Sequence, residues 1–148
     1  MILIDKYYMI GTTRFSEQTY QENKRWRESN QYAGCIYGTP RKMAEKIRRG
    51  REIYVIEMNN TVNQVMGIGK IKNESQHCRQ KYRMYKDDFY NRYTYMGECR
   101  VDRKDIKKEK LLELEKVLFY GKGHMKRGSS ITCISHQKVD VDYIKSLF

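Results

Sequence analysis

The chain contains few cysteines, and none of them lies in a short metal-binding spacing. The four cysteines are Cys35, Cys78, Cys99 and Cys133. Combining them with His77, His124 and His136 still produces no paired CxxC or HxxxH pattern, so the sequence does not predict a zinc site. We therefore expect reduced thiols in a cytosolic protein, with no metal and no other cofactor.

Long apolar runs are also missing. No stretch approaches the roughly 20 apolar residues that a membrane-spanning helix needs. The N-terminal MILIDKYYMIG includes Asp5 and Lys6 and lacks a preceding basic region, so it predicts a strand and not a signal peptide. The helix expected from Asp105 mixes acids and bases on its polar face and needs its apolar stripe for the core, which argues against membrane binding. We expect a cytoplasmic protein that is not secreted.

The chain carries a glycine-rich basic stretch, but not a nucleotide-binding motif. Residues 121–128, GKGHMKRG, lack the GxxxxGK[ST] spacing and precede an expected strand at 130–134 instead of a helix. The stretch can still present backbone N–H groups together with Lys122, Lys126 and Arg127 to a phosphate chain.

Paired carboxylates and nucleophile motifs are equally absent. Asp87 and Asp88 are adjacent, so their side chains diverge, while Asp102 or Asp105 is explained as a helix cap. No local signature supports a cysteine–histidine pair. We therefore assign no catalytic residue from motifs.

Acidic residues are scarce relative to basic ones. The chain has 30 Lys+Arg against 18 Asp+Glu, a formal charge of +12, which favours a polyanionic partner and nucleic acid first. Thirteen tyrosines accompany a single tryptophan, and tyrosine suits both a core and base stacking. Trp26, between Arg25 and Arg27, either packs its helix on the core or offers a stacking face.

The segment from Thr39 to Ile71 predicts a helix followed by a hairpin. Thr39 and Pro40 suit the first positions of a helix, and Gly50 suits its end. The basic residues of this helix form either a solvated face or a phosphate-facing surface. They are Arg41, Lys42, Lys46, Arg48, Arg49 and Arg51.

Two strands, 53–56 and 65–71, then flank a polar turn at 59–61. Gly67 and Gly69 lie two residues apart and face the same side of the second strand. Such a pair marks a barrel bend or a place where a large group sits close to the backbone.

The remaining periodicity completes the expected order of elements. Before the 39–71 segment it predicts a strand at 6–11 with a polar end at 12–14, a helix from Ser16 to about Arg27, and an irregular piece around Tyr37. After that segment it predicts a long loop to 90, a strand at 91–101 and a helix from 105 to Gly121. A strand at 130–134 and a closing helical turn complete the chain. This order predicts one α+β domain over residues 1–148, with about five to six strands in a small curved sheet or barrel and helices packed at its ends.

Four segments resemble the PUA-like superfamily, and within it the EVE, YTH and ASCH branches. They are KYYMIGTTR, CIYGTPRKMAEKI, IYVIEMNNTVNQVMGIGKI with its GIG, and YMGECRVDRKDI. The later FYGKGHMKRGSSI is similar to PUA-like proteins of large DNA viruses, which would imply the cytoplasm or nucleus of a host cell.

The resemblance to YTH domains implies a base pocket. It places Thr12 and Thr13 against the base, Tyr37 as one aromatic wall, and Tyr82 or Tyr85 as another. Trp26 is a further candidate, although YTH cages are built mainly from tryptophans and this chain has one. The candidates for backbone contacts are Arg14, Arg41, Lys42, Arg49, Lys122, Lys126 and Arg127.

The expected function is therefore nucleic-acid binding, with RNA favoured over DNA, in which an aromatic pocket recognises a modified or flipped base. The alternative is an ASCH-like ribonuclease or small amidohydrolase that uses the same cleft. Its candidate residues are Lys6, Lys70, Tyr93 and His124. A third possibility is a protein-interaction module with a basic face. The sequence leaves the oligomeric state open.

Overall fold

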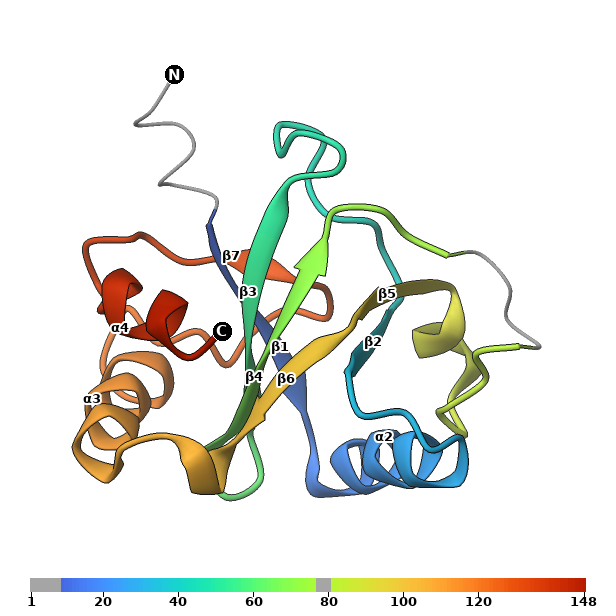
Figure 1. Cartoon of the computed structure of the whole chain (residues 1–148), viewed down its shortest axis with the longest axis horizontal. Helices are drawn as coiled ribbons and strands as arrows, with labels where there is room; N and C mark the ends of the chain where they lie inside the picture. The colour runs from blue at the N-terminus through green and yellow to red at the C-terminus, as the bar shows by residue number, and fades with distance from the viewer. Residues whose placement is uncertain (1–8, 77–80) are drawn as a thin grey trace.

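A computed structural model describes residues 9–76 and 81–148, which form two sheets and three α-helices (Figure 1). In chain order the elements are β1 (Ile10–Phe15), α2 (Glu17–Ser29), β2 (Cys35–Thr39), β3 (Glu52–Asn59), β4 (Gln64–Lys72), the 3-10 turn η1 (Asp88–Asn91), β5 (Tyr93–Gly97), β6 (Cys99–Asp102), the 3-10 turn η2 (Arg103–Asp105), α3 (Lys108–Phe119), β7 (Thr132–Cys133) and α4 (Val141–Ser146).

The larger sheet is mixed and open. Its strand order is β6-β4-β3-β1-β7, and β1 and β3 run parallel while the other neighbours are antiparallel. A second sheet of β2 and β5 packs against β4, to the right of the larger sheet in Figure 1. The predicted α+β class is confirmed. A closed barrel is not formed by the described residues.

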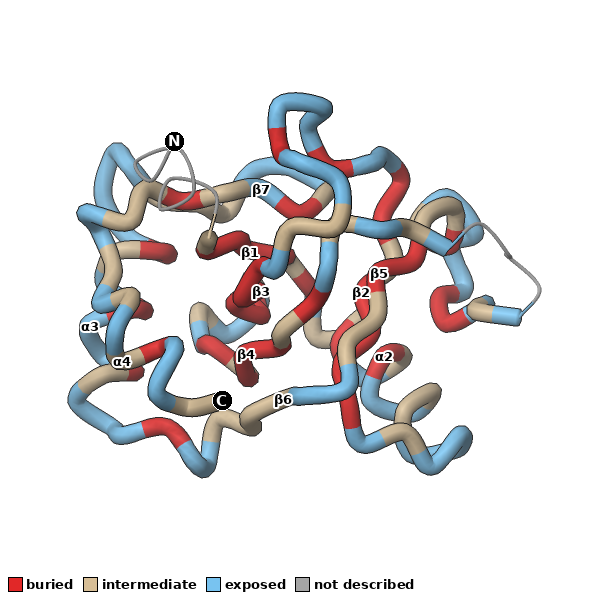
Figure 2. Tube along the Cα trace, turned by 45° about the horizontal axis from the view of Figure 1, so that its top comes forward, coloured by how far each residue is buried: buried red, intermediate tan, exposed pale blue. Residues whose placement is uncertain are grey.

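The core is divided between two sides of the larger sheet. One side packs against β2, β5 and α2, and the other against α3 and α4. Figure 2 shows the buried positions following the strands and the inner faces of the helices. The predicted stripe of α3 is largely confirmed, since Leu111, Leu114 and Leu118 are buried. Burying each such side chain contributes about 1.5–3 kcal/mol.

Helix α2 begins where the sequence predicts. The Ser16 hydroxyl accepts from the Thr19 N–H at 3.1 Å, and the Ser16 N–H donates to the Thr19 hydroxyl at 2.9 Å. These reciprocal bonds satisfy two of the amides that a helix N-terminus leaves unpaired. The β3–β4 hairpin is also confirmed, and the Asn59 side chain accepts from the Thr61 N–H at 3.1 Å within its turn.

The helix expected after Thr39 is wrong, because residues 40–51 form turns. The Thr39 hydroxyl donates to the Arg41 carbonyl at 2.8 Å instead of accepting from a backbone N–H, and the Met43 N–H donates to the Tyr95 hydroxyl at 2.9 Å. Tertiary contacts thus replace the helical ones in a segment too short to be a stable helix alone. Gly50 does adopt the positive φ expected of a turn, at 81°.

Several strands differ from expectation. Thr12, Thr13 and Arg14 lie inside β1 and not beyond its polar end. The piece around Tyr37 is strand β2, and the single strand expected at 91–101 is two strands that belong to different sheets. The chain leaves one sheet at Gly97 and enters the other at Cys99, so the expected common face does not persist.

The ends of α3 were only partly predicted. Asp102 caps η2 by accepting from the Lys104 N–H at 3.2 Å, and α3 itself starts after Lys107 without a side-chain cap. Gly121 follows the helix with φ of 80°, as expected of a residue past a helix end. Among the residues that the structure describes, no helix combines the length and apolar character needed to cross a membrane.

Candidate functional site

A cavity of about 360 Å³ opens where β1 meets α2. We call it the β1 cavity. It is lined by Thr13, Arg14, Phe15, Ser16, Gln18, Thr19, Glu22, Gly38, Tyr85, Asp87, Tyr90, Gly128 and Ser129. These residues come from two strands, one helix, the segment leading into η1, and the glycine-rich stretch, so the cavity is assembled from distant parts of the chain.

Two tyrosines, together with Phe15, form the aromatic part of this cavity. The rings of Tyr85 and Tyr90 meet edge to face, with centroids 6.5 Å apart. The Asn23 side chain donates to the Tyr85 hydroxyl at 3.0 Å, and burial raises the pKa of that phenol. A Cβ on Gly38 would come within 2.7 Å of the Tyr85 ring and closer still to the Tyr90 carbonyl, so the glycine admits both residues.

The position of Tyr85 is fixed from behind by Asn91. The side-chain oxygen of Asn91 accepts from the backbone N–H groups of Met84 and Tyr85, both at 3.0 Å. The side-chain NH₂ of Asn91 donates to the backbone carbonyl of Tyr85 at 2.8 Å. Asn91 is fully buried, and all three bonds are made to backbone groups. The ring is therefore held on a rigid support before any ligand arrives.

The polar part of the β1 cavity is acidic and hydroxyl-rich. Glu22 accepts from the Lys86 N–H at 2.8 Å and Asp87 from the Phe89 N–H at 3.1 Å, and in each carboxylate the other oxygen accepts no hydrogen bond from a described residue. The side chains of Thr13, Gln18 and Ser129 likewise have no hydrogen-bond partner within residues 9–76 and 81–148. These donors and acceptors are what the edge of a neutral base requires.

Arg14 borders the cavity, but its guanidinium is already used. It donates to the carbonyls of Gly128 at 3.0 Å and Met125 at 3.1 Å, and to that of Ser130. It also donates to the hydroxyls of Thr12 and Thr132, both at 3.0 Å. Five bonds exhaust the five N–H donors of an arginine. That Arg14 contacts a nucleic-acid backbone therefore stays a prediction that its internal bonding does not favour.

Arg14 instead fastens residues 121–130, which we call the basic loop. Asn60 adds a second anchor by donating to the Lys126 carbonyl at 2.9 Å. Lys122 and Arg127 remain exposed, Lys126 is half-buried, and Arg127 directly precedes Gly128 at the cavity. The backbone of this loop thus reaches an opening whose own charged side chains are acidic, apart from the fully bonded Arg14.

Of the predicted base-pocket residues, the structure brings Thr13 and Tyr85 into the β1 cavity. Thr12 is fully buried and donates to the Thr132 carbonyl at 3.2 Å, so it faces the protein. Tyr37 is 1% exposed and also lies outside the cavity. The expected roles of Thr12 and Tyr37 in contacting a base stay predictions that this placement does not favour.

Trp26 and Tyr82 lie together, but away from the cavity. Their rings are 6.3 Å apart, and Trp26 meets Tyr32 edge to face at 6.0 Å. Tyr32 is in turn tied to the Gly97 carbonyl at 2.7 Å. All three rings are half-buried against the core, which supports the packing explanation of Trp26.

Tyr37 belongs to a buried charged cluster at the junction of the two sheets. Its hydroxyl donates to Glu57 at 2.7 Å, and Arg100 donates to both oxygens of Glu57 at 2.9 and 2.6 Å. The Arg100 side chain also reaches Asp102 at 2.9 Å and the Tyr20 hydroxyl at 3.2 Å. We call these five residues the junction network.

The titration of this network reflects its burial. Burial by itself lowers the pKa of Arg100, but the Glu57 carboxylate beside it outweighs burial, and the net shift is upward. Burial, with Cys35 and Glu57 nearby, raises the pKa of Tyr37 well above its usual value. Both groups therefore keep one protonation state throughout the physiological pH range.

The glycine pair of β4 makes room for this network. A Cβ on Gly67 would lie 2.6 Å from the Arg100 guanidinium, and one on Gly69 would lie 2.5 Å from the Cys35 sulfur and closer to the Tyr37 hydroxyl. Of the two explanations offered for the pair, close approach of a large group is the one that the structure supports.

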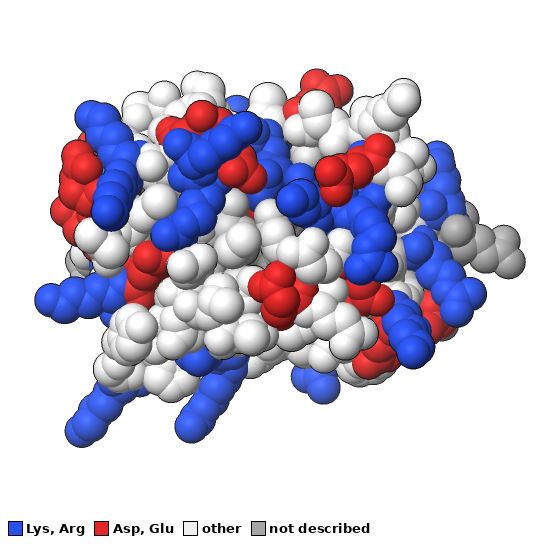
Figure 3. Space-filling view, turned by 90° about the horizontal axis from the view of Figure 1, so that it is seen from below, with Lys and Arg blue, Asp and Glu red and all other residues white. Residues whose placement is uncertain are grey.

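The other predicted cations lie elsewhere. Arg41, Lys42 and Arg49 are exposed on residues 40–51, which lead into β3 beside the start of β1, whereas the cavity lies at the end of β1. Figure 3 shows one face of the molecule, seen from below the view of Figure 1, on which basic and acidic side chains are interspersed. The excess positive charge is thus not one patch on that face.

The residues of the enzymatic alternative are scattered. Lys70 pairs with Glu52 at 3.4 Å, Tyr93 lies under Lys42, and His124 accepts from the Lys126 N–H at 3.3 Å. These three do not line a common cavity, and Lys6 lies outside the described residues. Within the described parts of the chain no three His, Cys, Asp or Glu side chains are placed to hold a metal, and His77 and Cys78 fall outside those parts.

Sequence reasoning missed eight polar or aromatic residues of the β1 cavity, which are Phe15, Ser16, Gln18, Thr19, Glu22, Asp87, Tyr90 and Ser129. Gln18 and Glu22 are four apart on α2, so the helix prediction already placed them on one face. No comparable signal marked Asp87 and Tyr90, since the loop before β5 has no periodicity.

Comparison with models of known protein families, with curated proteins and with solved structures found no match. The resemblance to PUA-like domains therefore stays a prediction. The function has to be argued from the cavity and the basic loop themselves.

Proposed function

We propose that this protein is a PUA-like nucleic-acid-binding domain that takes an unpaired or flipped base into the β1 cavity. The observation that carries the proposal is the meeting of Tyr85 and Tyr90 with unpaired polar side chains, beside a loop that bears Lys122, Lys126 and Arg127. The resemblance to YTH and EVE domains favours RNA over DNA and a modified base over a plain one.

The chemistry of the cavity suits a base and not a phosphate. Glu22 and Asp87 would repel an anion, and the one arginine at the wall has no free donor. A neutral base can stack on an aromatic ring, worth about 1–3 kcal/mol, and offer its amino group to the carboxylates. A volume of about 360 Å³ lies within the range of small-molecule sites.

The basic loop supplies the complementary contact to the backbone. Its backbone is held beside the cavity by the bonds of Arg14 and Asn60, and Arg127 directly precedes Gly128 of the cavity lining. Phosphate contacts fix the position of a strand without selecting its sequence, whereas the cavity selects the base. The two parts therefore predict separable effects on salt dependence and on discrimination between bases.

The test is a salt titration of binding to matched single-stranded RNA and DNA, with and without N6-methyladenine or 5-methylcytosine. Lys126→Ala with Arg127→Ala should reduce the slope of log K against log salt by about 0.7 for each lost contact. Tyr90→Leu should leave that slope unchanged and reduce the preference for the modified strand. Single-turnover cleavage of labelled RNA, measured in parallel, detects the enzymatic alternative.

Matched controls come from the same chain. Arg48→Ala with Arg49→Ala removes the same charge at the other end of β1, and Tyr120→Leu removes an exposed tyrosine outside the cavity. If both double variants change the slope equally and no strand is preferred, the protein has only a charged surface and the proposal fails.

A further inference from the structure

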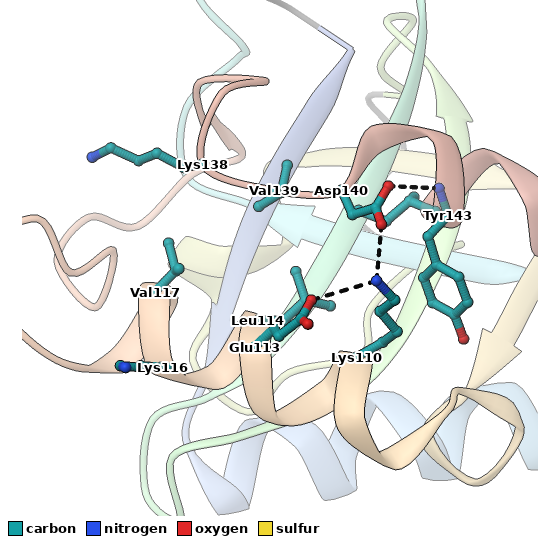
Figure 4. Close-up of a pocket in the computed structure, with 10 residues that line it drawn as sticks. Lys110, Glu113, Leu114, Lys116, Val117, Lys138, Val139, Asp140 and Tyr143 are labelled. Atoms are coloured by element: carbon teal, nitrogen blue, oxygen red, sulfur yellow. Dashed lines mark hydrogen bonds and ion pairs between the residues drawn. The ribbon is translucent and has the colours of Figure 1, made fainter.

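A second cavity lies between α3 and the segment that leads into α4, apart from the β1 cavity. Its volume is about 550 Å³, and we call it the helix cavity (Figure 4). The apolar side chains that line it are Leu114, Val117, Val139, Tyr143 and Ile144. Leu114 and Ile144 are buried and form its floor, whereas Val117, Val139 and Tyr143 are half-buried. It therefore offers apolar surface that the fold itself does not cover.

One end of the helix cavity is closed by an ion-paired cluster of one lysine and two carboxylates. Lys110 reaches across from α3 and donates to Asp140 at 2.9 Å, and it also pairs with Glu113 at 3.6 Å. The hydrogen bond from Lys110 lowers the pKa of Asp140, and the Asp140 carboxylate raises the pKa of Lys110. Both acids of the cavity are thus occupied by one lysine.

The other end carries uncompensated positive charge. Figure 4 shows Lys116 on α3 and Lys138 on the facing segment at the same end of the cavity, away from Lys110. Neither ammonium group forms an ion pair or hydrogen bond with any residue in 9–76 or 81–148. The cavity consequently has an apolar body and a cationic end.

We propose that the helix cavity binds a small amphipathic anion, an acyl chain that ends in a carboxylate. The chain would lie over Leu114, Val117 and Val139, and the carboxylate would lie at the end framed by Lys116 and Lys138. Burial of the chain supplies most of the affinity, because apolar area removed from water is the larger contribution. The two lysines supply the selectivity for an anionic head.

The experiment is an NMR titration of the full chain with decanoate, decanol and decyltrimethylammonium, each below its micelle concentration. The three probes share a chain and differ in the charge of the head. Saturable decanoate binding should shift the amide signals of Val117, Val139 and Ile144, with weaker binding of decanol and weakest binding of the cation.

Variants separate the cationic end from general charge. Lys116→Gln with Lys138→Gln should weaken decanoate roughly fivefold, as expected of two exposed charge contacts, and leave decanol unchanged. Lys108→Gln with Lys145→Gln, which alters exposed lysines of α3 and α4 outside the cavity, should change neither.

Three results would overturn the proposal. Decanol binding as tightly as decanoate would mean that the cationic end selects nothing. Equal losses in both double variants would mean that only net charge matters. Shifts confined to amides outside the helix cavity, or no shifts at all, would mean that the cavity takes no acyl chain.

Discussion

The junction network and the β1 cavity are made of the same materials, tyrosines, carboxylates and an arginine, but they differ in how fully these groups are bonded. Glu57 accepts three hydrogen bonds, from Tyr37 and Arg100, and is 2% exposed. In the β1 cavity, Glu22 and Asp87 each keep an oxygen without a partner among the described residues, and the hydroxyl of Thr13 has none.

This difference separates structure from function. A buried polar group without a partner costs about 1–3 kcal/mol, so the saturation of the junction network is what makes its burial possible. Polar groups beside an open cavity are satisfied by water and can exchange it for a ligand. The network therefore determines how the two sheets meet, while the cavity keeps polar groups that are not bonded to the described protein.

The largest effect is expected from removing the arginine of the junction network. Arg100→Met leaves Glu57 buried and without its cation, which should lower the free energy of unfolding by about 3–5 kcal/mol. Urea denaturation followed by circular dichroism measures this. The double variant Glu57→Gln with Arg100→Met should be more stable than Arg100→Met alone.

The control is Lys104→Gln, an exposed cation near the same strand, which should change stability by less than about 0.5 kcal/mol. A loss below about 1 kcal/mol in Arg100→Met would mean that Glu57 reaches water. The junction network would then be open to water like the β1 cavity, and the distinction between the two regions would not hold.

A smaller loss is expected from filling the space that the network needs. Gly69→Ala places a Cβ 2.5 Å from the Cys35 sulfur and against the Tyr37 hydroxyl, which should cost about 1–3 kcal/mol. Gly123→Ala is the matched control, since its Cβ would meet only the flexible end of Lys138 at 3.1 Å. Equal stability of the two variants in thermal unfolding would contradict the close packing of Cys35 and Tyr37 against Gly69 on β4.

Arg14 shares a feature with each region. All of its N–H donors are bonded, as in the junction network, yet it borders the β1 cavity. Arg14→Gln removes the bonds to Met125, Gly128 and Ser130, so we expect the basic loop to open locally with a global loss of about 1 kcal/mol. Trypsin should then cleave after Lys126 and Arg127 faster than in the native chain. Arg25→Gln, an exposed arginine on α2, should leave the cleavage rate unchanged; if it does not, the anchor is not specific.

The sequence predicted the elements whose signals are local. The start of a helix at Ser16, the apolar stripe of α3 and the β3–β4 hairpin each depend on residues a few positions apart, and all three are present. For the glycine pair at Gly67 and Gly69, close approach was one of two explanations, the other being a barrel bend, and close approach is what the structure shows. What the pair did not reveal was the approaching group, since Tyr37 and Arg100 come from other strands.

Where the structure departs from the predictions, the cause is contact between residues that are far apart in the sequence. Strand β2 exists because Cys35–Thr39 pairs with β5, about sixty residues later, and Tyr37 is buried because Glu57 accepts its hydroxyl. The N–H donors of the Arg14 guanidinium are bonded to groups that include carbonyls more than a hundred residues away in the sequence. Long-range pairing of this kind is invisible to propensity and periodicity. Of the predicted base-pocket residues, only Thr13 and Tyr85 line the β1 cavity, and the binding of a base there stays a prediction.

The smallest effect on stability, and the most direct test of the open region, is expected at Gln18. Its side chain lines the β1 cavity, is exposed and has no hydrogen-bond partner among the residues that the structure describes, so Gln18→Ala should change the free energy of unfolding by less than about 0.5 kcal/mol. It should nevertheless weaken the preference for a modified strand, because a donor and an acceptor at the cavity are lost. Gln21→Ala is the control, since Gln21 lies on the same helix outside the cavity and bonds Glu17 at 2.9 Å. If Gln18→Ala leaves both stability and binding unchanged, Gln18 is not part of the site. If Gln18→Ala lowers the free energy of unfolding, Gln18 has a structural role like the residues of the junction network.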